Sequence, residues 1–318
     1  MDPTRTGDPA AAAAHPRLHA LIDVARAKAS VRVPVLGVVY PCDPLAIDSA
    51  AAIAAAGIAH PVLIGPARAI AQAAAACNRS PGDFDTIDAP DDPRRSAQVA
   101  VGLVREGRLA ALMKGSLHTD ELLSAVVGRS GLRTGRRMSH AFVFDLPRYH
   151  KLLALSDCVC NIAPDLAAKR DIVTNALALL GNLGIAQPKV GVLAAVETVN
   201  PAIPATVDAA ELVRLCRDGA WPAALIEGPF GFDNAFSAEA ARIKRIESRV
   251  AGDADLLLVP DLNAGNLLYK SFVYVGAGEC AGIMLGTQVP IVLTSRADSL
   301  LARTASAALA MLASDAGA

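Results

Sequence analysis

The most concentrated group of polar residues in the sequence follows a short apolar run near residue 260. The run Leu256–Val259 stops at Pro260, and an apolar pattern resumes after a polar turn and ends in Lys270. The turn carries four residues of turn-forming or polar type: Asp261, Asn263, Gly265 and Asn266. This order predicts a buried parallel strand, a tight loop and a helix start. A helix needs only one capping residue, so we expect the segment from Asn263 to Lys270 to contact a ligand at the strand end.

Three further segments place polar residues directly after a predicted strand. Lys114-Gly-Ser-Leu-His-Thr119 follows the run Ala110–Met113, and Glu227-Gly-Pro-Phe-Gly-Phe-Asp-Asn-Ala-Phe-Ser237 follows Ala224–Ile226. The third is Pro290-Ile-Val-Leu-Thr-Ser-Arg-Ala-Asp-Ser299. A phosphate or acyl phosphate must be held by cations and backbone N–H groups, and arginine does this with two parallel hydrogen bonds.

These three segments and the Pro260–Lys270 loop, in this order, resemble the phosphate acetyltransferase and butyryltransferase family over nearly the whole chain beyond the first thirty residues. Glu227 departs conservatively from the aspartate that family members usually carry, and Thr-Ser-Arg-Ala-Asp-Ser at residues 294–299 is closer to the butyryltransferases. The resemblance implies reversible transfer of a short acyl group between coenzyme A and phosphate. Acyl-CoA and phosphate would then be the substrates, with no further cofactor and no metal.

The family's serine-arginine pair falls on Ser295 and Arg296. The resemblance implies that Arg296 holds the phosphate or polarises the carbonyl, and that Ser295 donates a hydrogen bond to the developing oxyanion. No covalent acyl-enzyme is required if both substrates bind together, because proximity supplies much of the acceleration. Ser295 is poorly supported as an activated nucleophile, since the sequence has no Gly-x-Ser-x-Gly elbow and no obvious histidine partner for it. A helix-capping Ser295 with a solvated Arg296 is the structural alternative.

The sequence identifies the catalytic base less clearly than it identifies the serine-arginine pair. In the acetyltransferases an aspartate a couple of helical turns after the serine-arginine pair takes the thiol proton, but the predicted helix Leu300–Leu312 contains no acid. Asp298 is the nearest candidate. Aspartate is also a favoured N-cap residue, so a catalytic base and a helix cap are both open for Asp298.

The resemblance also implies a substrate-binding arginine before the second domain, a role that Arg133 or Arg136 fits. The alternative for each arginine is that its side chain lies on a solvated surface and binds no substrate. Lys114, Ser116 and His118 lie in a strand-end loop that faces the same cleft by topology, so we predict that they contact substrate. The competing interpretation of His118 is a structural histidine whose ring is hydrogen-bonded within the protein.

Composition narrows the class of protein. The 318 residues exceed the usual size of one core, and 53% are hydrophobic but only 4% aromatic, which predicts two domains with aliphatic interiors. A formal charge of -1 argues against nucleic-acid binding, and no apolar run is long enough to span a membrane. The start of the chain lacks the pattern of a signal peptide. Six scattered cysteines without C-x-x-C spacing indicate reduced thiols in a cytoplasmic protein.

Short β-branched runs alternate with Ala/Leu-rich segments, which predicts an α/β fold with parallel sheets in two domains. Predicted strands include Leu256–Val259 and Cys158–Ile162, and predicted helices include Ala238–Arg249. Residues 1–138 with 290–318 are expected to form the first domain and residues 139–289 the second, with the active-site cleft between them. The return of the last strand and helix to the first domain, an isocitrate/isopropylmalate dehydrogenase-like fold and a homodimer are implied by the resemblance.

Two other functions stay open at this stage. A metal- and NAD-dependent dehydrogenase of isocitrate or hydroxythreonine-phosphate type has a similar fold, but the sequence shows no paired aspartates for a divalent metal and no dinucleotide fingerprint. A non-catalytic acyl-CoA-binding partner is the other, because the expected downstream acid is missing. The preferred acyl length depends on pocket volume, and one methylene discriminates by only ~1–3 kcal/mol.

Overall fold

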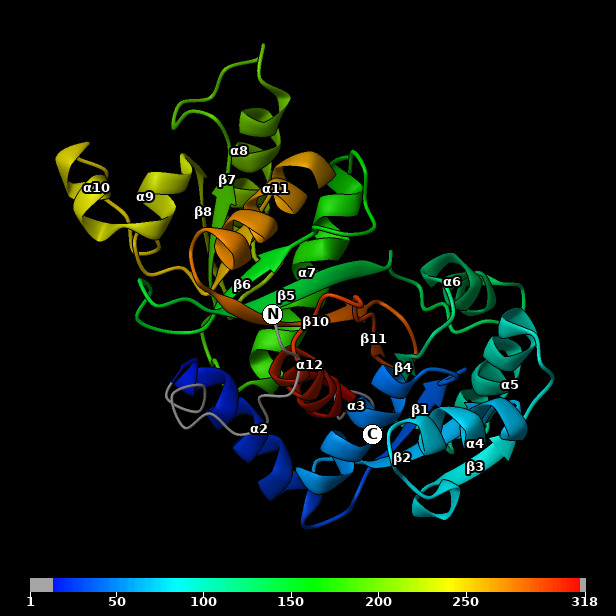
Figure 1. The fold of residues 1–318 in the computed structure, drawn as a ribbon. Helices are drawn as coiled ribbons and strands as arrows, with labels where there is room; N and C mark the ends of the chain where they lie inside the picture. The colour runs from blue at the N-terminus through cyan, green and yellow to red at the C-terminus, as the bar shows by residue number, and fades with distance from the viewer. Residues whose placement is uncertain (1–13, 315–318) are drawn as a thin grey trace.

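A computed structural model describes residues 14–314 of the chain. The predicted absence of a signal peptide concerns residues that lie mostly outside this range. Within it the strands form a single mixed sheet in the order β3-β2-β1-β4-β11-β10-β5-β6-β9-β7-β8 (Figure 1). The strands are β1 (Val35–Val39), β2 (His60–Gly65), β3 (Asp85–Asp88), β4 (Ala111–Lys114), β5 (Ser139–Asp145), β6 (Leu153–Ser156), β7 (Lys189–Leu193), β8 (Leu225–Phe230), β9 (Leu256–Leu258), β10 (Glu279–Leu285) and β11 (Ile291–Val292).

Helices lie between most of the strands and cover the sheet. They are α2 (Pro16–Ala29), α3 (Pro44–Ala55), α4 (Ala67–Ala76), a 3-10 turn η1 (Pro81–Asp83), α5 (Pro93–Arg105), α6 (Thr119–Val127), α7 (Leu166–Asn182), α8 (Pro204–Arg217), α9 (Phe232–Phe236), α10 (Ala238–Ile243), α11 (Leu262–Tyr274) and α12 (Leu300–Ala313). None of the helices in residues 14–314 combines the length and the hydropathy needed to cross a membrane.

The sheet consists of two parallel groups joined by antiparallel strands. β3, β2, β1, β4 and β11 are parallel to one another, as are β6, β9, β7 and β8. Between the groups, β10 pairs antiparallel with both β11 and β5, and β5 pairs antiparallel with β6. Three successive reversals mean that the two groups run in opposite directions. Their carboxyl ends, where α/β sheets bind ligands, therefore lie at opposite edges of the sheet.

The alanine-rich helix α12 is buried along most of its length and packs against β10, α2, α3 and α7 (Figure 1). Small side chains allow this close approach from several sides at once. Because β11 is hydrogen-bonded to β4, the end of the chain lies beside strands from its beginning. On the other half of the sheet, Tyr269 of α11 stacks on Phe142 of β5 with ring centroids 4.3 Å apart.

The α/β class is as predicted, and the structure has one large sheet that is mostly parallel, but three local predictions are wrong. Residues 158–162 form no strand, because the side chain of Asp157 accepts the backbone N–H groups of Val159 and Cys160 at 2.8 and 3.0 Å and turns the chain. The expected loop after Pro260 is helical from Leu262, because Asp261 caps α11 by accepting the Ala264 N–H at 2.9 Å. The helix predicted over residues 238–249 ends at Ile243.

Candidate active site

The loops that follow β1, β4 and β11 lie together, because these strands are parallel neighbours in the sheet. The loop after β4 is fixed to the loop after β1 by Ser116, whose hydroxyl donates to Tyr40 O at 2.7 Å and accepts the Cys42 N–H at 2.8 Å. The preceding Gly115 comes so close to β1 that a Cβ there would lie 2.5 Å from Val39 O. Ser116 therefore lies where the sequence predicts, and its hydroxyl already serves two contacts within the protein.

The loop after β11 forms a tight turn from Ser295 to Asp298. Asp298 Oδ2 accepts the Ser295 N–H at 2.7 Å, and the Asp298 N–H donates to Ser295 O at 3.2 Å. Ser295 and Arg296 are exposed, and the Arg296 guanidinium makes no hydrogen bond or ion pair with residues 14–314. Helix α12 is capped by Ser299, whose hydroxyl accepts the Ala302 N–H at 3.0 Å. The alternatives in which Asp298 or Ser295 is the helix cap are therefore wrong.

Charges of both signs meet at this turn. Burial lowers the pKa of Lys114, and the nearby positive charges of Arg303 and Arg296 lower it further. Burial raises the pKa of Asp298, against the opposing effects of the Ser295 N–H and of Arg303. Asp43, at the start of α3, also acts on Lys114 and Arg303. The negative charge of Glu279 also raises the pKa of Asp298. Lys114, Arg296 and Arg303 thus lie near three carboxylates, and Arg296 is the cation of the three that makes no hydrogen bond or ion pair within residues 14–314, which leaves its guanidinium available to an anion.

Arg303 is the residue of this cluster that the sequence analysis missed. It projects from the first turns of α12, is 4% exposed, and donates to the backbone carbonyl of Ser295. A signal was present in the sequence: an arginine inside the otherwise alanine-rich run Leu300–Leu312 is out of place on a buried helix unless it has partners.

His118 and the residues of α11 occupy other positions. His118 precedes α6 with an exposed side chain, and its backbone N–H donates to Glu121 Oε2 at 2.8 Å. Asn263, Gly265 and Asn266 lie in the first turns of α11, at the carboxyl end of β9. A Cβ on Gly265 would lie 2.7 Å from Asp157 O, so close helix packing accounts for this glycine.

The second half of α11 approaches the turn after β11. Burial raises the pKa of Tyr269, and the nearby ionisable groups Cys280 and Asp298 raise it further. Lys270, the next residue, is exposed. The two ends of α11 thus lie near different loops of the protein.

Arg133 and Arg136 lie at the amino end of β11, whereas Ser295 follows its carboxyl end. Arg133 forms an isolated bridge with Thr287 in the β10–β11 turn. Arg136 lines a cavity of about 240 Å³ together with Thr287 and residues of α7. The structure therefore does not bring these arginines to the Ser295 turn within one chain.

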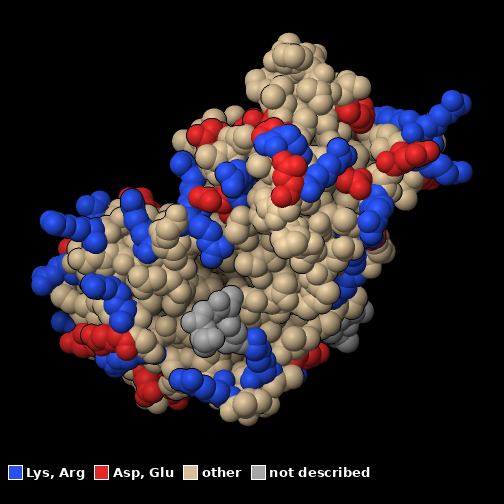
Figure 2. All heavy atoms as spheres, turned by 180° about the vertical axis from the view of Figure 1, so that it is seen from behind, with Lys and Arg blue, Asp and Glu red and all other residues tan. Residues whose placement is uncertain are grey.

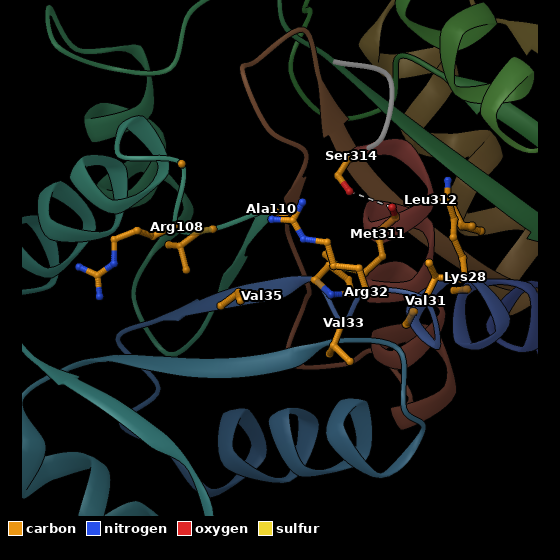
Figure 3. Close-up of a pocket in the computed structure, with 15 residues that line it drawn as sticks. Lys28, Val31, Arg32, Val33, Val35, Arg108, Ala110, Met311, Leu312 and Ser314 are labelled. Atoms are coloured by element: carbon orange, nitrogen blue, oxygen red, sulfur yellow. Dashed lines mark hydrogen bonds between the residues drawn. The ribbon is translucent and has the colours of Figure 1, made fainter. Parts of the chain in front are cut away.

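A cavity of about 490 Å³ lies at the opposite end of β1 and β4 from the Ser295 turn (Figure 3). It is lined by Val35, which begins β1, by Ala110, which precedes β4, and by basic side chains from Lys28, Arg32 and Arg108. None of the sequence-predicted site residues lines it. We place the candidate active site at the other edge, where the charged cluster follows the strands.

Figure 2 shows one face of the molecule, on which Lys and Arg side chains are interspersed with Asp and Glu. No continuous basic surface covers that face. This mixture of charges on one face is in line with the formal charge of -1.

Comparison with known proteins identifies relatives over most of the chain. Residues 85–311 match the phosphate acetyl/butaryl transferase family. The chain is 47% identical over 293 residues to a phosphate acetyltransferase of Rhizobium meliloti, covering 92% of each chain. It is 39% identical over 257 residues to a phosphate butyryltransferase of Clostridium acetobutylicum, covering 80% of this chain and 85% of the relative.

The fold is similar to that of a branched-chain phosphotransacylase from Enterococcus faecalis V583. The TM-score is 0.78 at 30% sequence identity, with 89% of this chain and 99% of the other covered. The matched range includes the loops after β4, β8, β9 and β11, from which the sequence resemblance was drawn. The chain therefore belongs to the family of phosphate acetyl and butyryl transferases.

Proposed function

We propose that this protein is a phosphate acyltransferase that transfers a short acyl group reversibly between coenzyme A and inorganic phosphate. The observation that carries the proposal is the charged cluster after β4 and β11, where Lys114 and Arg303 lie near Asp298 and the exposed Arg296. An exposed arginine without a protein partner at these strand ends suits phosphate, and the matched family is named for phosphate acetyl and butyryl transfer.

Arg296 is the group best suited to hold the phosphate, because its guanidinium is exposed and has no partner among the described residues. It would pair with two phosphate oxygens at once, which a lysine cannot do. Lys114 donates two hydrogen bonds, to Gly115 O at 3.1 Å and Leu117 O at 3.3 Å. One N–H of its ammonium remains for the anion.

The transfer itself needs a thiolate and a stabilised oxyanion. Asp298 is proposed to take the proton of the coenzyme A thiol, and a raised pKa makes its carboxylate a better base for that task. The thiolate then attacks the acyl carbonyl of the acyl phosphate, and the tetrahedral intermediate expels phosphate. Ser295 Oγ accepts the Ala297 N–H at 3.3 Å, which leaves the hydroxyl proton to donate to the oxyanion.

The alternatives from the sequence are less well supported. Among residues 14–314, no group of three or more His, Cys, Asp or Glu side chains is arranged to hold a metal, as the dehydrogenase hypothesis would need. The relatives are named as acetyl- or butyryltransferases. A non-catalytic acyl-CoA-binding partner was suggested by the missing downstream acid, and Asp298 supplies an acid beside Ser295.

We further propose the organisation predicted from the resemblance: two domains divided near residues 138 and 290, an active site between them, an isocitrate/isopropylmalate dehydrogenase-like arrangement, and a cytoplasmic homodimer. The continuous sheet with two oppositely directed parallel groups is compatible with such a division. In this arrangement, Arg133, Arg136 and the amides of α11 would contact the extended coenzyme A rather than the phosphate.

The proposal is tested by measuring thiol release from acetyl-, propionyl- and butyryl-CoA with and without inorganic phosphate. We expect turnover that requires phosphate and persists with a chelator and without nicotinamide. Phosphate-independent turnover, or loss of activity with the chelator, contradicts the proposal. The ratio of kcat/KM values across the three substrates gives the preferred chain length.

A further inference from the structure

Within residues 14–314, the hydrogen bonds that join the Ser295–Asp298 turn to the rest of the protein come from a single buried side chain. Arg303 donates through Nη2 to Ser295 O and through Nε to Asp298 O at 3.3 Å. These two carbonyls flank Arg296, the proposed phosphate ligand. The same guanidinium donates through Nη1 to the hydroxyls of Thr294 and Ser49 at 3.3 and 3.4 Å.

The turn has few other constraints. The remaining hydrogen bonds recorded for residues 295–298, within the part of the chain that the structure describes, join those residues to one another. Ser299, the next residue, is held by Glu279 Oε2 at 2.5 Å. Arg303 thus fixes an otherwise self-contained turn to Thr294, which follows β11, on one side and to Ser49 of α3 on the other.

Arg303 is placed to orient the site rather than to touch a substrate. Arg303 is 4% exposed, and its guanidinium donates its hydrogen bonds to oxygen atoms of the protein. Its positive charge also lies close to Asp298 and Lys114. A planar guanidinium spans several acceptors in a fixed geometry, which an ammonium cannot reproduce.

We propose that Arg303 is a positioning residue that holds the Ser295–Asp298 turn in its reactive geometry through the carbonyls on either side of Arg296. The role in acyl transfer rests on the proposed function above. The mechanical part, that Arg303 orders the turn, does not. This separation allows the two to be tested independently.

The test uses the full-length variants Arg303→Met and Arg303→Lys. Lys169→Met is the matched control, because Lys169 is also 4% exposed and pairs with Asp208 at 2.6 Å far from the turn. Steady-state kinetics with acyl-CoA and phosphate, and hydrogen exchange of the peptide spanning residues 293–299, are measured for each. Loss of a buried charged partner destabilises both kinds of variant, so stability alone does not distinguish them.

We expect Arg303→Met to lower kcat by ~100-fold, since displacement of a reacting group by about 1 Å costs that much. We expect exchange in residues 293–299 to rise at least ~10-fold as the turn opens locally. Arg303→Lys should recover part of both. Lys169→Met should keep wild-type kcat and wild-type exchange in this peptide.

Wild-type kcat in Arg303→Met, or lost activity with unchanged exchange, would overturn the proposal. If Arg303→Met does not fold, Arg303→Lys decides by the same two measurements, with an intermediate loss expected in both. If the wild-type protein shows no phosphate-dependent acyl transfer, the proposed function fails. The exchange comparison then still decides whether Arg303 orders the turn.

Discussion

Asp298 and Ser295 are joined side chain to backbone, with Asp298 Oδ2 accepting the Ser295 N–H at 2.7 Å. Asp298 is half-buried, and this partial burial raises the pKa of its carboxylate. A carboxylate that is anchored through one oxygen keeps the second oxygen available to accept a proton. One oxygen of Asp298 thus holds the side chain in place, and the other is free for the proposed proton transfer.

Asp298→Asn tests the proposed base. Asparagine retains an acceptor for the Ser295 N–H but cannot take a thiol proton. We expect a low kcat that recovers as pH rises and the coenzyme A thiol ionises unaided, measured as a pH profile of the direction that consumes acyl phosphate. A near-normal rate at neutral pH would remove Asp298 from the proton transfer.

Asp298 should also leave a signature in the pH dependence of stability. Its folded pKa is raised, so the folded state binds this proton more tightly than the unfolded chain does. The group therefore favours folding below the ordinary aspartate pKa, and this contribution is lost as pH rises through the raised pKa. Asp298→Asn should flatten that part of the curve in thermal unfolding measured across acidic pH. An unchanged curve would argue against a buried carboxyl.

Arg296→Lys tests the phosphate ligand. The guanidinium is exposed and makes no ion pair with the described residues, so the protein should fold with unchanged stability. We expect at least a ~100-fold loss in kcat, equivalent to ~2.7 kcal/mol of transition-state stabilisation. Ser295→Ala removes one neutral donor and should cost less. Activity of Arg296→Lys close to that of wild type, or an acyl group trapped covalently on Ser295, contradicts this mechanism.

The arginines before β5 are predicted to act on a different substrate. Arg133 and Arg136 lie at the amino end of β11, away from the Ser295 turn, and phosphate is compact whereas coenzyme A is long. Arg136→Ala should therefore raise KM for coenzyme A and leave KM for phosphate unchanged, as Arg133→Ala should if that arginine is the ligand. Lys114→Met should do the reverse. An increase in phosphate KM for Arg136→Ala would place it in the anion site.

The strand-end positions of Lys114, Ser295, Arg296 and Asp298 were predicted well from the sequence. Apolar runs mark buried parallel strands, and the loops that follow neighbouring parallel strands lie at the same edge of the sheet. It did not predict the partners that fix these loops. Arg303 and Ser49 are 254 residues apart, and no local pattern reports a contact over that separation. The antiparallel strand β10 was also missed, and with it the reversal that sends the carboxyl end of β9 to the opposite edge.

The segment after Pro260 was misjudged for a local reason. Asparagine and glycine at residues 263, 265 and 266 are typical of turns, so a loop was predicted. The structure continues the helix through them, because Asp261 caps it and Gly265 is needed where α11 meets the chain at Asp157. A residue type that is typical of turns, Gly265, thus allows close packing of α11 against Asp157.

This difference yields a prediction with opposite outcomes for neighbouring residues. Gly265→Ala would place a Cβ 2.7 Å from Asp157 O, and overpacking of this kind typically costs ~1–3 kcal/mol of unfolding free energy. Asn263 is exposed and Asn266 is half-buried, and alanine is the better helix former at both positions. Asn263→Ala and Asn266→Ala should therefore keep or slightly raise the thermal stability.

If the amides contact coenzyme A, the two asparagine variants should raise its KM or lower kcat, while Gly265→Ala loses stability first. Thermal unfolding and steady-state kinetics on the same preparations separate these effects. Intact kinetics in both asparagine variants would show that the first turns of α11 serve packing alone. The proposed chemistry would then reside in the turn after β11, because Ser295, Arg296 and Asp298 lie there and the first turns of α11 lie at the other edge of the sheet.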